Sequence, residues 1–192
     1  MLIGVLALQG AFREHIAALK KLNIETKEIR NKNDIDGIDG LIIPGGESTA
    51  IGKLLRDLDM FDILKEMMLK GLPVFGTCAG MILLAKKLVN DDRVHLGVMD
   101  IEVRRNAYGR QLGSFKCFEK FKGIEGDVEM VFIRAPYIEK VGEKVEVLAK
   151  VGDDIVAARQ GNLLAISFHP ELTEELKIHK YFYEMCLKYK VV

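Results

Sequence analysis

Residues 72–85 have the sequence LPVFGTCAGMILLA, in which a cysteine stands two residues from a glycine on either side. The run LPVF before Gly76 is typical of a short buried strand, and the run MILLA after Gly80 is typical of the start of a helix. Because glycine has no Cβ atom, these two glycines allow a strand and a helix to converge at a sharp turn. The stretch therefore predicts an elbow that presents Cys78 at the N-terminus of a helix, where unpaired backbone N–H groups favour a thiolate.

The first half of the chain alternates apolar runs of strand length with segments of helical period, which is typical of a parallel sheet covered by helices. From Val98 to about Ile166 the pattern changes to short strands separated by turns rich in Gly, Asn and Asp, which predicts antiparallel or mixed pairing. We therefore expect an α/β fold of three layers, with a mixed and mostly parallel sheet flanked by helices. The expected strands of the first half are Leu2–Leu8, Ile24–Ile29 and Leu41–Ile43, and the expected helices are a stripe from Phe12 to Leu22, then Ser48–Arg56, Met60–Lys70 and finally Thr173–Tyr189.

Length and charge limit the classes of protein to consider. The chain has 192 residues without a linker or repeat, so we expect one domain spanning residues 1–192. Its 28 basic and 28 acidic residues balance, which gives no electrostatic reason to expect a nucleic acid or a membrane as partner. The opening run Leu2–Leu8 lacks a basic leader and is too short to span a bilayer. We expect a cytoplasmic enzyme.

The three cysteines lie far apart, at Cys78, Cys117 and Cys186. They form neither a CxxC pair nor a His/Cys cluster with the spacing of metal ligands, so we expect no disulfide framework and no metal. Cys186 falls on the apolar face of the last helical segment, and Cys117 has phenylalanines close by, so both are predicted to fill the core. Cys78 remains as the candidate nucleophile.

A cysteine nucleophile needs a base, because a thiol with the ordinary pKa of about 8.5 is mostly protonated at neutral pH. His169 is the candidate, since it follows an apolar strand and begins the sequence His-Pro-Glu. Pro170 disfavours a helical conformation at the residue before it, so we expect an extended segment that projects His169 and Glu171 to the same side. A carboxylate beside an imidazole fixes its tautomer and stabilises the imidazolium. The other histidines are predicted to be surface or packing residues: His15, His95 and His179.

The segment Pro44–Thr49, with the sequence PGGEST, follows an expected strand. Its two glycines let backbone N–H groups turn toward a ligand, and Ser48 or Thr49 is predicted to cap the helix that follows. In an open parallel sheet the ligand site lies beyond the carboxyl ends of the strands. Gln9–Gly10, this loop and the elbow all lie at such ends, so we expect them to surround one site.

The order of these motifs resembles the class I, triad-type glutamine amidotransferases. Within that class, five segments resemble the glutaminase subunits of pyridoxal 5'-phosphate synthase, the PdxT family, and together they extend over nearly the whole chain. The segments are GVLALQG at 4–10, PGGEST at 44–49, GTCAG at 76–80, RNAYGRQ at 105–111 and IRAP at 133–136. The resemblance implies a flavodoxin-like α/β fold.

The resemblance also implies roles for residues in the hydrolysis of L-glutamine to L-glutamate and ammonia. Cys78 would attack the side-chain amide, His169 would be the acid and base, and Glu171 would orient His169. Backbone N–H groups of Gly46 and Ala79 would form the oxyanion hole. The implied glutamine-binding residues are Gly46, Glu47, Ser48, Arg105, Ile133 and Arg134. No cofactor and no metal are implied.

The chain has no segment left for a domain that consumes ammonia, and the family implies a separate acceptor, the synthase subunit PdxS. Gln9 and Gly10 are candidates for the docking surface. Three alternatives remain open: a PfpI-like hydrolase or chaperone, a catalytically silent subunit, and a glutaminase that serves another pathway. The PfpI-like group usually has a histidine directly after the cysteine, whereas this chain has Ala79.

Overall fold

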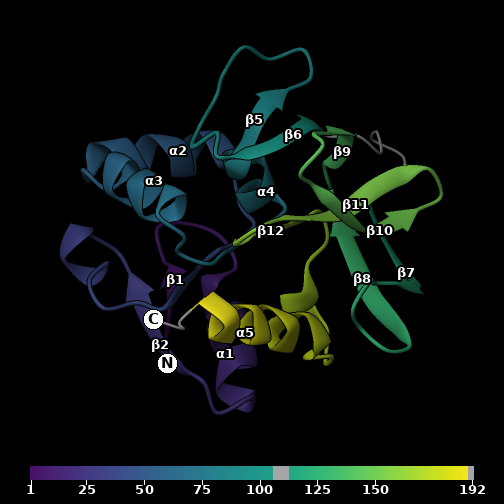
Figure 1. Ribbon diagram of the computed structural model, residues 1–192, viewed down its shortest axis with the longest axis horizontal. Coiled ribbons are helices and arrows are strands. Elements are labelled where there is room, and N and C mark those ends of the chain that lie inside the picture. Colours follow the sequence, from purple (N-terminus) through teal and green to yellow (C-terminus); the bar gives the residue numbers. More distant parts are fainter. Residues whose placement is uncertain (106–112, 190–192) are drawn as a thin grey trace.

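The structure is a computed structural model that describes residues 1–105 and 113–189. Its centre is a mixed sheet with the strand order β2-β1-β3-β4-β12-β11-β9-β6-β5, and β10 pairs with β11 (Figure 1). The strands of this sheet are β1 Leu2–Leu6, β2 Glu25–Ile29, β3 Gly40–Ile43, β4 Val74–Thr77, β5 Ala85–Leu88, β6 Met99–Arg104, β9 Tyr137–Val141, β10 Glu146–Val151, β11 Asp154–Gln160 and β12 Leu163–Ile166. A separate two-stranded sheet pairs β7 Ser114–Lys120 with β8 Asp127–Ile133.

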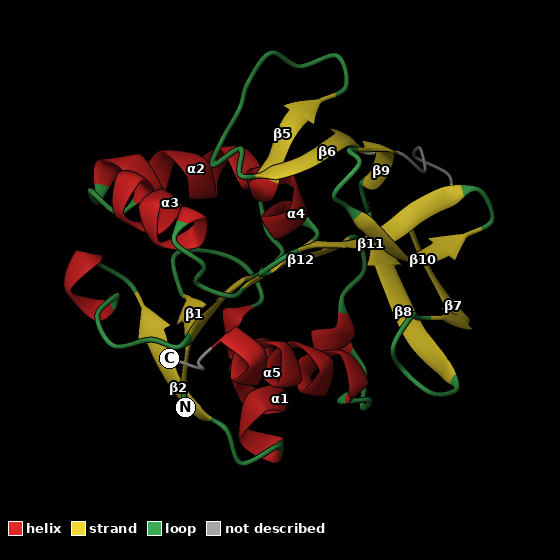
Figure 2. Cartoon of the chain, viewed as in Figure 1, coloured by secondary structure: helices red, strands yellow, loops and turns green. Residues whose placement is uncertain are grey.

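Helices cover both faces of the large sheet, as Figure 2 shows: α1 and α5 lie on one side, and α2, α3 and α4 lie on the other. The helices are α1 Phe12–Lys21, α2 Ser48–Asp57, α3 Phe61–Leu69, α4 Ala79–Leu84 and α5 Lys177–Tyr189, with short 3-10 helices η1 Lys32–Asp34 and η2 Pro170–Leu172. The predicted three-layer α/β architecture is thus confirmed.

Pairing within the sheet follows the predicted change in pattern. The strands β2, β1, β3, β4 and β12 are all parallel to one another, whereas β11 is antiparallel to β12, β9 and β10. Because β12 lies directly beside β4, with Ile166 opposite Thr77, the two chain segments that end in His169 and Cys78 leave the same edge of the sheet. The sheet therefore brings together two residues that are distant in sequence.

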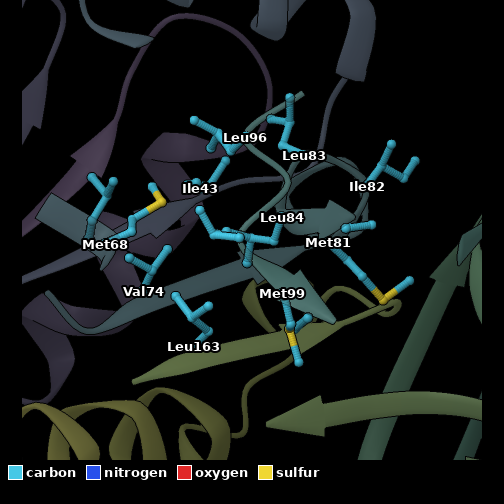
Figure 3. Close-up of a cluster of buried hydrophobic side chains, with 14 of the residues drawn as sticks. Ile43, Met68, Val74, Met81, Ile82, Leu83, Leu84, Leu96, Met99 and Leu163 are labelled. Carbon is cyan, nitrogen blue, oxygen red and sulfur yellow. The ribbon is translucent and has the colours of Figure 1, made fainter. Parts of the chain in front are cut away.

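The core has two parts because the central strands bury both faces. Alternate residues of a strand point to opposite sides, so Val74 packs under α2 to α4 and Phe75 packs under α1 and α5. Figure 3 shows the first cluster, where Val74 lies among Ile43, Leu84 and Leu163. This double burial explains why the strands appear as continuous apolar runs rather than alternating ones.

Several boundaries differ from those expected. The helix after the elbow ends at Leu84, because Ala85–Leu88 pairs in parallel with β6 instead. The last helix begins at Lys177 rather than Thr173, since the Thr173 hydroxyl accepts the Glu175 N–H at 3.2 Å and forms a local turn.

The His-Pro-Glu segment is also not extended as predicted. Pro170 opens the 3-10 turn η2, a position that suits proline because its fixed φ matches the turn and no N–H is needed there. Among the cysteines, Cys186 is fully buried as predicted, but Cys117 is only half-buried on the small sheet. In the described part of the chain, none of the helices has the length and apolar character needed to cross a membrane.

Candidate active site

The elbow has the geometry that its glycines predict. Cys78 has φ 49° and ψ −98°, a backbone conformation that non-glycine residues rarely adopt and that marks a strained turn. A Cβ atom on Gly76 would lie 2.6 Å from the carbonyl carbon of Gly80, and one on Gly80 would lie 2.2 Å from the carbonyl oxygen of Ile43. The Cys78 N–H donates to the Ile166 carbonyl at 2.8 Å, which ties the elbow to β12. Only glycine fits at the two flanking positions.

His169 and Glu171 form a close pair. The Nδ1 atom of His169 lies 2.7 Å from Oε1 of Glu171, whose side chain is fully buried. The His169 N–H donates to the Val131 carbonyl at 2.8 Å, so the small sheet holds the backbone at this point. Burial alone would lower the pKa of His169, but its interactions with Cys78 and Glu171 outweigh burial and raise that pKa to about 10.

The carboxyl of Glu171 stays ionised despite its burial. Burial alone would raise the pKa of Glu171, but the neighbouring His15 and His169 hold it below its ordinary value. His169 therefore interacts with an anionic carboxylate and with Cys78, and groups of these three types are able to act together as a nucleophile, a base and an orienting acid.

The loop that follows β3 closes over these groups. A Cβ atom on Gly45 would lie 2.5 Å from Cε1 of His169 and 3.5 Å from Cβ of Cys78. A Cβ atom on Gly46 would lie 2.3 Å from Oε1 of Gln9, which accepts the Glu47 N–H at 2.7 Å. The two glycines thus allow the loop to pass directly over the cysteine and the histidine.

Helix α2 is capped by a different residue from the two predicted. The Glu47 carboxylate accepts the N–H groups of Thr49 and Ala50 at 3.0 and 2.6 Å, so Glu47 is the N-cap and Ser48 begins the helix. Burial alone would raise the pKa of Glu47, but these hydrogen bonds keep it below its ordinary value. The buried Ser48 hydroxyl has no hydrogen-bond partner among the described residues, and Ser48 lines the cavity described next.

A cavity of about 610 Å³ opens beside Cys78 and His169. The cavity is lined by all six residues that were expected to bind glutamine, together with Gln9 and Gly10. The six are Gly46, Glu47, Ser48, Arg105, Ile133 and Arg134. Ala79, the other expected oxyanion donor, directly follows Cys78 as the buried first residue of α4. The expected site residues therefore lie in one place.

Two guanidinium groups lie at this cavity. Arg105 Nη1 lies 3.3 Å from Oδ2 of Asp91, and Arg105 Nη2 lies 3.6 Å from Oε1 of Glu47. Arg134 has φ 45°, and its N–H donates to the Gly113 carbonyl at 2.6 Å. The rest of the RNAYGRQ motif, residues 106–111, lies outside the described residues.

The sequence did not predict that two histidines, His15 and His179, lie beside the His169–Glu171 pair. His15 and His179 were predicted to be surface or packing residues. The structure shows the second of these: both are fully buried, and His15 Nδ1 lies 2.9 Å from His179 Nε2. The available signal was spacing: His15 precedes Leu19 by four residues and His179 precedes Phe182 by three, which places each on the buried face of its helix.

Comparisons with known proteins agree on one family. A model of the SNO glutamine amidotransferase family matches residues 5–188. Pyridoxal 5'-phosphate synthase subunit PdxT of Streptococcus pneumoniae strain CGSP14 is 55% identical over 190 residues, which is 97% of each chain. A solved structure described as a glutamine amidotransferase matches with TM-score 0.92 and 52% identity, covering 96% of this chain and 98% of that one. The structure of PurLQS from Thermotoga maritima, 14% identical with TM-score 0.71 over 98% and 97% of the two chains, shares the fold.

Proposed function

Since the chain belongs to the SNO glutamine amidotransferase family, we propose that it is the glutaminase subunit of a pyridoxal 5'-phosphate synthase. In this proposal, one domain spanning the chain hydrolyses L-glutamine to L-glutamate and ammonia and delivers the ammonia to the synthase subunit PdxS. The observation that carries the proposal is the strained Cys78 elbow facing the same cavity as the His169–Glu171 pair.

The first half of the reaction forms a thioester. The Cys78 thiolate attacks the side-chain amide carbon of glutamine, and the carbonyl oxygen becomes an oxyanion. The His169 imidazolium then gives its proton to the amide nitrogen, so the C–N bond breaks and ammonia leaves. Glu171 stabilises the imidazolium until this transfer and keeps the ring in one tautomer.

The second half releases the product. A water molecule attacks the γ-glutamyl thioester while the neutral His169 takes its proton, and the C–S bond breaks to give glutamate and the thiolate. The backbone N–H groups of Gly46 and Ala79 hold the oxyanion in both halves, and one donor of this kind typically contributes about 3 to 4 kcal/mol. Arg105 or Arg134 pairs with the α-carboxylate of glutamine, to which a guanidinium can donate two parallel hydrogen bonds.

Docking of a partner explains where the ammonia goes. Most ammonia released into water at neutral pH would be protonated and lost, so the acceptor must cover the site during turnover. Gln9 and Gly10 are exposed at the rim of the cavity, and we include them in the docking surface. We expect PdxS binding to raise the glutaminase rate.

The decisive experiment mixes the purified chain with PdxS and measures both glutamate release and pyridoxal 5'-phosphate formation from glutamine. The variant Cys78→Ala should lose both activities, whereas Cys117→Ala, which alters a cysteine on the small sheet, should keep them. Glutamine hydrolysis that survives Cys78→Ala would overturn the catalytic assignment. Glutaminase activity without pyridoxal 5'-phosphate formation, or an equal rate with and without PdxS, would overturn the assignment to this synthase.

A further inference from the structure

Glu171 has two carboxylate oxygens, and each faces a different histidine. Oε1 contacts His169, whereas Oε2 lies 3.4 Å from Nε2 of His15, in a region where the side chains of Glu171 and His15 are fully buried. Among the described residues, Oε2 has no hydrogen bond of standard geometry. A buried carboxylate oxygen without a donor is energetically costly, so the facing imidazole matters for the charge on Glu171.

Two further contacts hold His15 in place. Its Nδ1 atom lies 2.9 Å from Nε2 of His179 on α5, and its Nε2 atom lies 3.3 Å from the Thr77 hydroxyl at the end of β4. Phe75 packs edge-on against the rings of both histidines. Residues from the first helix, the last helix and the elbow strand thus meet behind the His169–Glu171 pair.

The positions of the protons on the two histidines follow from the burial of His179. Its Nδ1 atom has no hydrogen-bond partner in the described part of the chain, so a proton there would be a buried, unsatisfied donor. The proton is therefore on Nε2 of His179, which donates to Nδ1 of His15. A neutral His15 then carries its own proton on Nε2, the atom that faces Glu171 Oε2.

From this arrangement we infer that His15 is a positioning residue of the glutaminase: its Nε2–H donates to the Thr77 hydroxyl and also faces Glu171 Oε2 at 3.4 Å, which favours the charged carboxylate and fixes the orientation in which that carboxylate supports His169. His179 acts one step further away, because its N–H selects the tautomer of His15. The inference rests on the proposed roles of Cys78, His169 and Glu171. It adds a residue from the N-terminal helix that does not line the cavity.

The charges around His15 agree with a neutral donor. Facing it from other elements are Glu171 on η2, His169 after β12 and His179 on α5, and its own helix adds Glu14. Burial is the largest influence and lowers the pKa of His15, and burial together with His15 lowers the pKa of His179 to about 3. Both rings are therefore uncharged at neutral pH, and His15 acts through its N–H dipole.

Loss of this donor has a defined effect on pH dependence. Without it the pKa of Glu171 rises, and the carboxylate stabilises the His169 imidazolium less well, so the pKa of His169 falls. In a plot of kcat against pH, the acid limb then shifts to higher pH and the alkaline limb shifts to lower pH. A merely structural role for His15 would lower stability and leave both limbs in place.

The test compares His15→Gln with His15→Asn in the complex with PdxS. Glutamine places an amide N–H close to the position of imidazole Nε2, whereas asparagine reaches only the position of Nδ1 and cannot contact Glu171. We expect His15→Asn to lower kcat roughly tenfold to a hundredfold and to narrow the pH profile by about one pH unit. His15→Gln should restore most of the kcat and most of the width of the pH profile. Phe75→Leu, which removes packing against the same two rings, should lower Tm and leave both limbs of the pH profile at the wild-type pH.

A second measurement needs no variant. In the wild-type chain labelled with ¹⁵N-histidine, the nitrogen chemical shifts should show His15 and His179 both neutral and both protonated at Nε2. A proton on Nδ1 of His15, or equal pH profiles for His15→Asn and wild type, would overturn the role of His15 and leave the glutaminase assignment intact. Retention of glutaminase activity by Cys78→Ala would instead overturn the assignment itself.

Discussion

His169 and Glu171 make a 2.7 Å contact between side chains only two residues apart, although the backbone that joins them turns rather than extends. The turn arises because Pro170 starts the 3-10 helix η2, which folds the Glu171 carboxylate back onto Nδ1 of His169. The carboxylate therefore holds one ring nitrogen, and in the proposed mechanism the Nε2 atom of His169 exchanges protons with Cys78 and the substrate.

Replacing this carboxylate should disable the reaction. In Glu171→Gln the charge is lost and an amide can present its own N–H to Nδ1, which favours the wrong tautomer of His169. We expect kcat for glutamine to fall by roughly two to four orders of magnitude, as in other triads of this type. Steady-state glutamate release in the presence of PdxS measures the effect. The matched control is Glu174→Gln, because Glu174 is exposed and pairs with Lys21 at the surface, and a similar loss in both variants would contradict the role of Glu171.

The raised pKa of His169 makes a prediction about stability. Because the folded-state pKa is about 10 and lies above the ordinary 6.5, the charged ring stabilises the fold fully below pH 6.5, and this contribution disappears as the pH rises toward 10. The difference in unfolding free energy between wild type and His169→Gln should therefore shrink between pH 6.5 and 10. Urea unfolding at several pH values measures it. A difference that stays constant or grows over this range would show that the imidazolium is not stabilised in the folded protein.

The elbow was predictable from sequence because its requirements are local. Gly76 and Gly80 are needed wherever a strand and helix converge this tightly, and the structure shows a steric conflict for any other residue at each position. The two-sided burial of the central strands was similarly visible as unbroken apolar runs. The elbow and the buried strands were predictable because residues adjacent in the sequence determine them.

The role of His15 was not predictable in the same way. A histidine on an amphipathic helix is compatible with either the surface or the core, and its burial here depends on His179, which is 164 residues away. The prediction of an extended His-Pro-Glu segment was wrong for a related reason. Proline suits both an extended segment and the first position of a turn. In both cases tertiary packing decided between two locally acceptable states.

Arg105 should contribute to the binding of glutamine. It lines the cavity and is held there by Asp91 and Glu47, so a bound α-carboxylate would meet an oriented guanidinium. We expect Arg105→Gln to raise KM for glutamine roughly tenfold to a hundredfold with a smaller change in kcat, since a hydrogen bond between charged groups typically contributes about 1.5 to 3 kcal/mol. The neighbouring Arg104 pairs with Glu139 at 2.6 Å and does not line the cavity, so Arg104→Gln is the matched control. A rise in KM for the control alone would contradict the assignment.

Gly10 should be essential for the loop that carries Gly46. Gly10 has φ +92°, and a Cβ atom there would lie 1.8 Å from the carbonyl oxygen of Gly45, which accepts the Ala11 N–H at 3.2 Å. The Gly10→Ala variant must therefore displace the loop, and with it the proposed oxyanion donor, so we expect kcat to fall by roughly 10²- to 10³-fold. The control is Gly37→Ala, since Gly37 has φ +80° but an added Cβ meets nothing within 4 Å. That control should lose about 1 kcal/mol of unfolding free energy through backbone strain and keep its activity. Parallel glutaminase assays and urea unfolding separate the two effects, and wild-type activity in a folded Gly10→Ala variant would show that the loop is not confined by this contact.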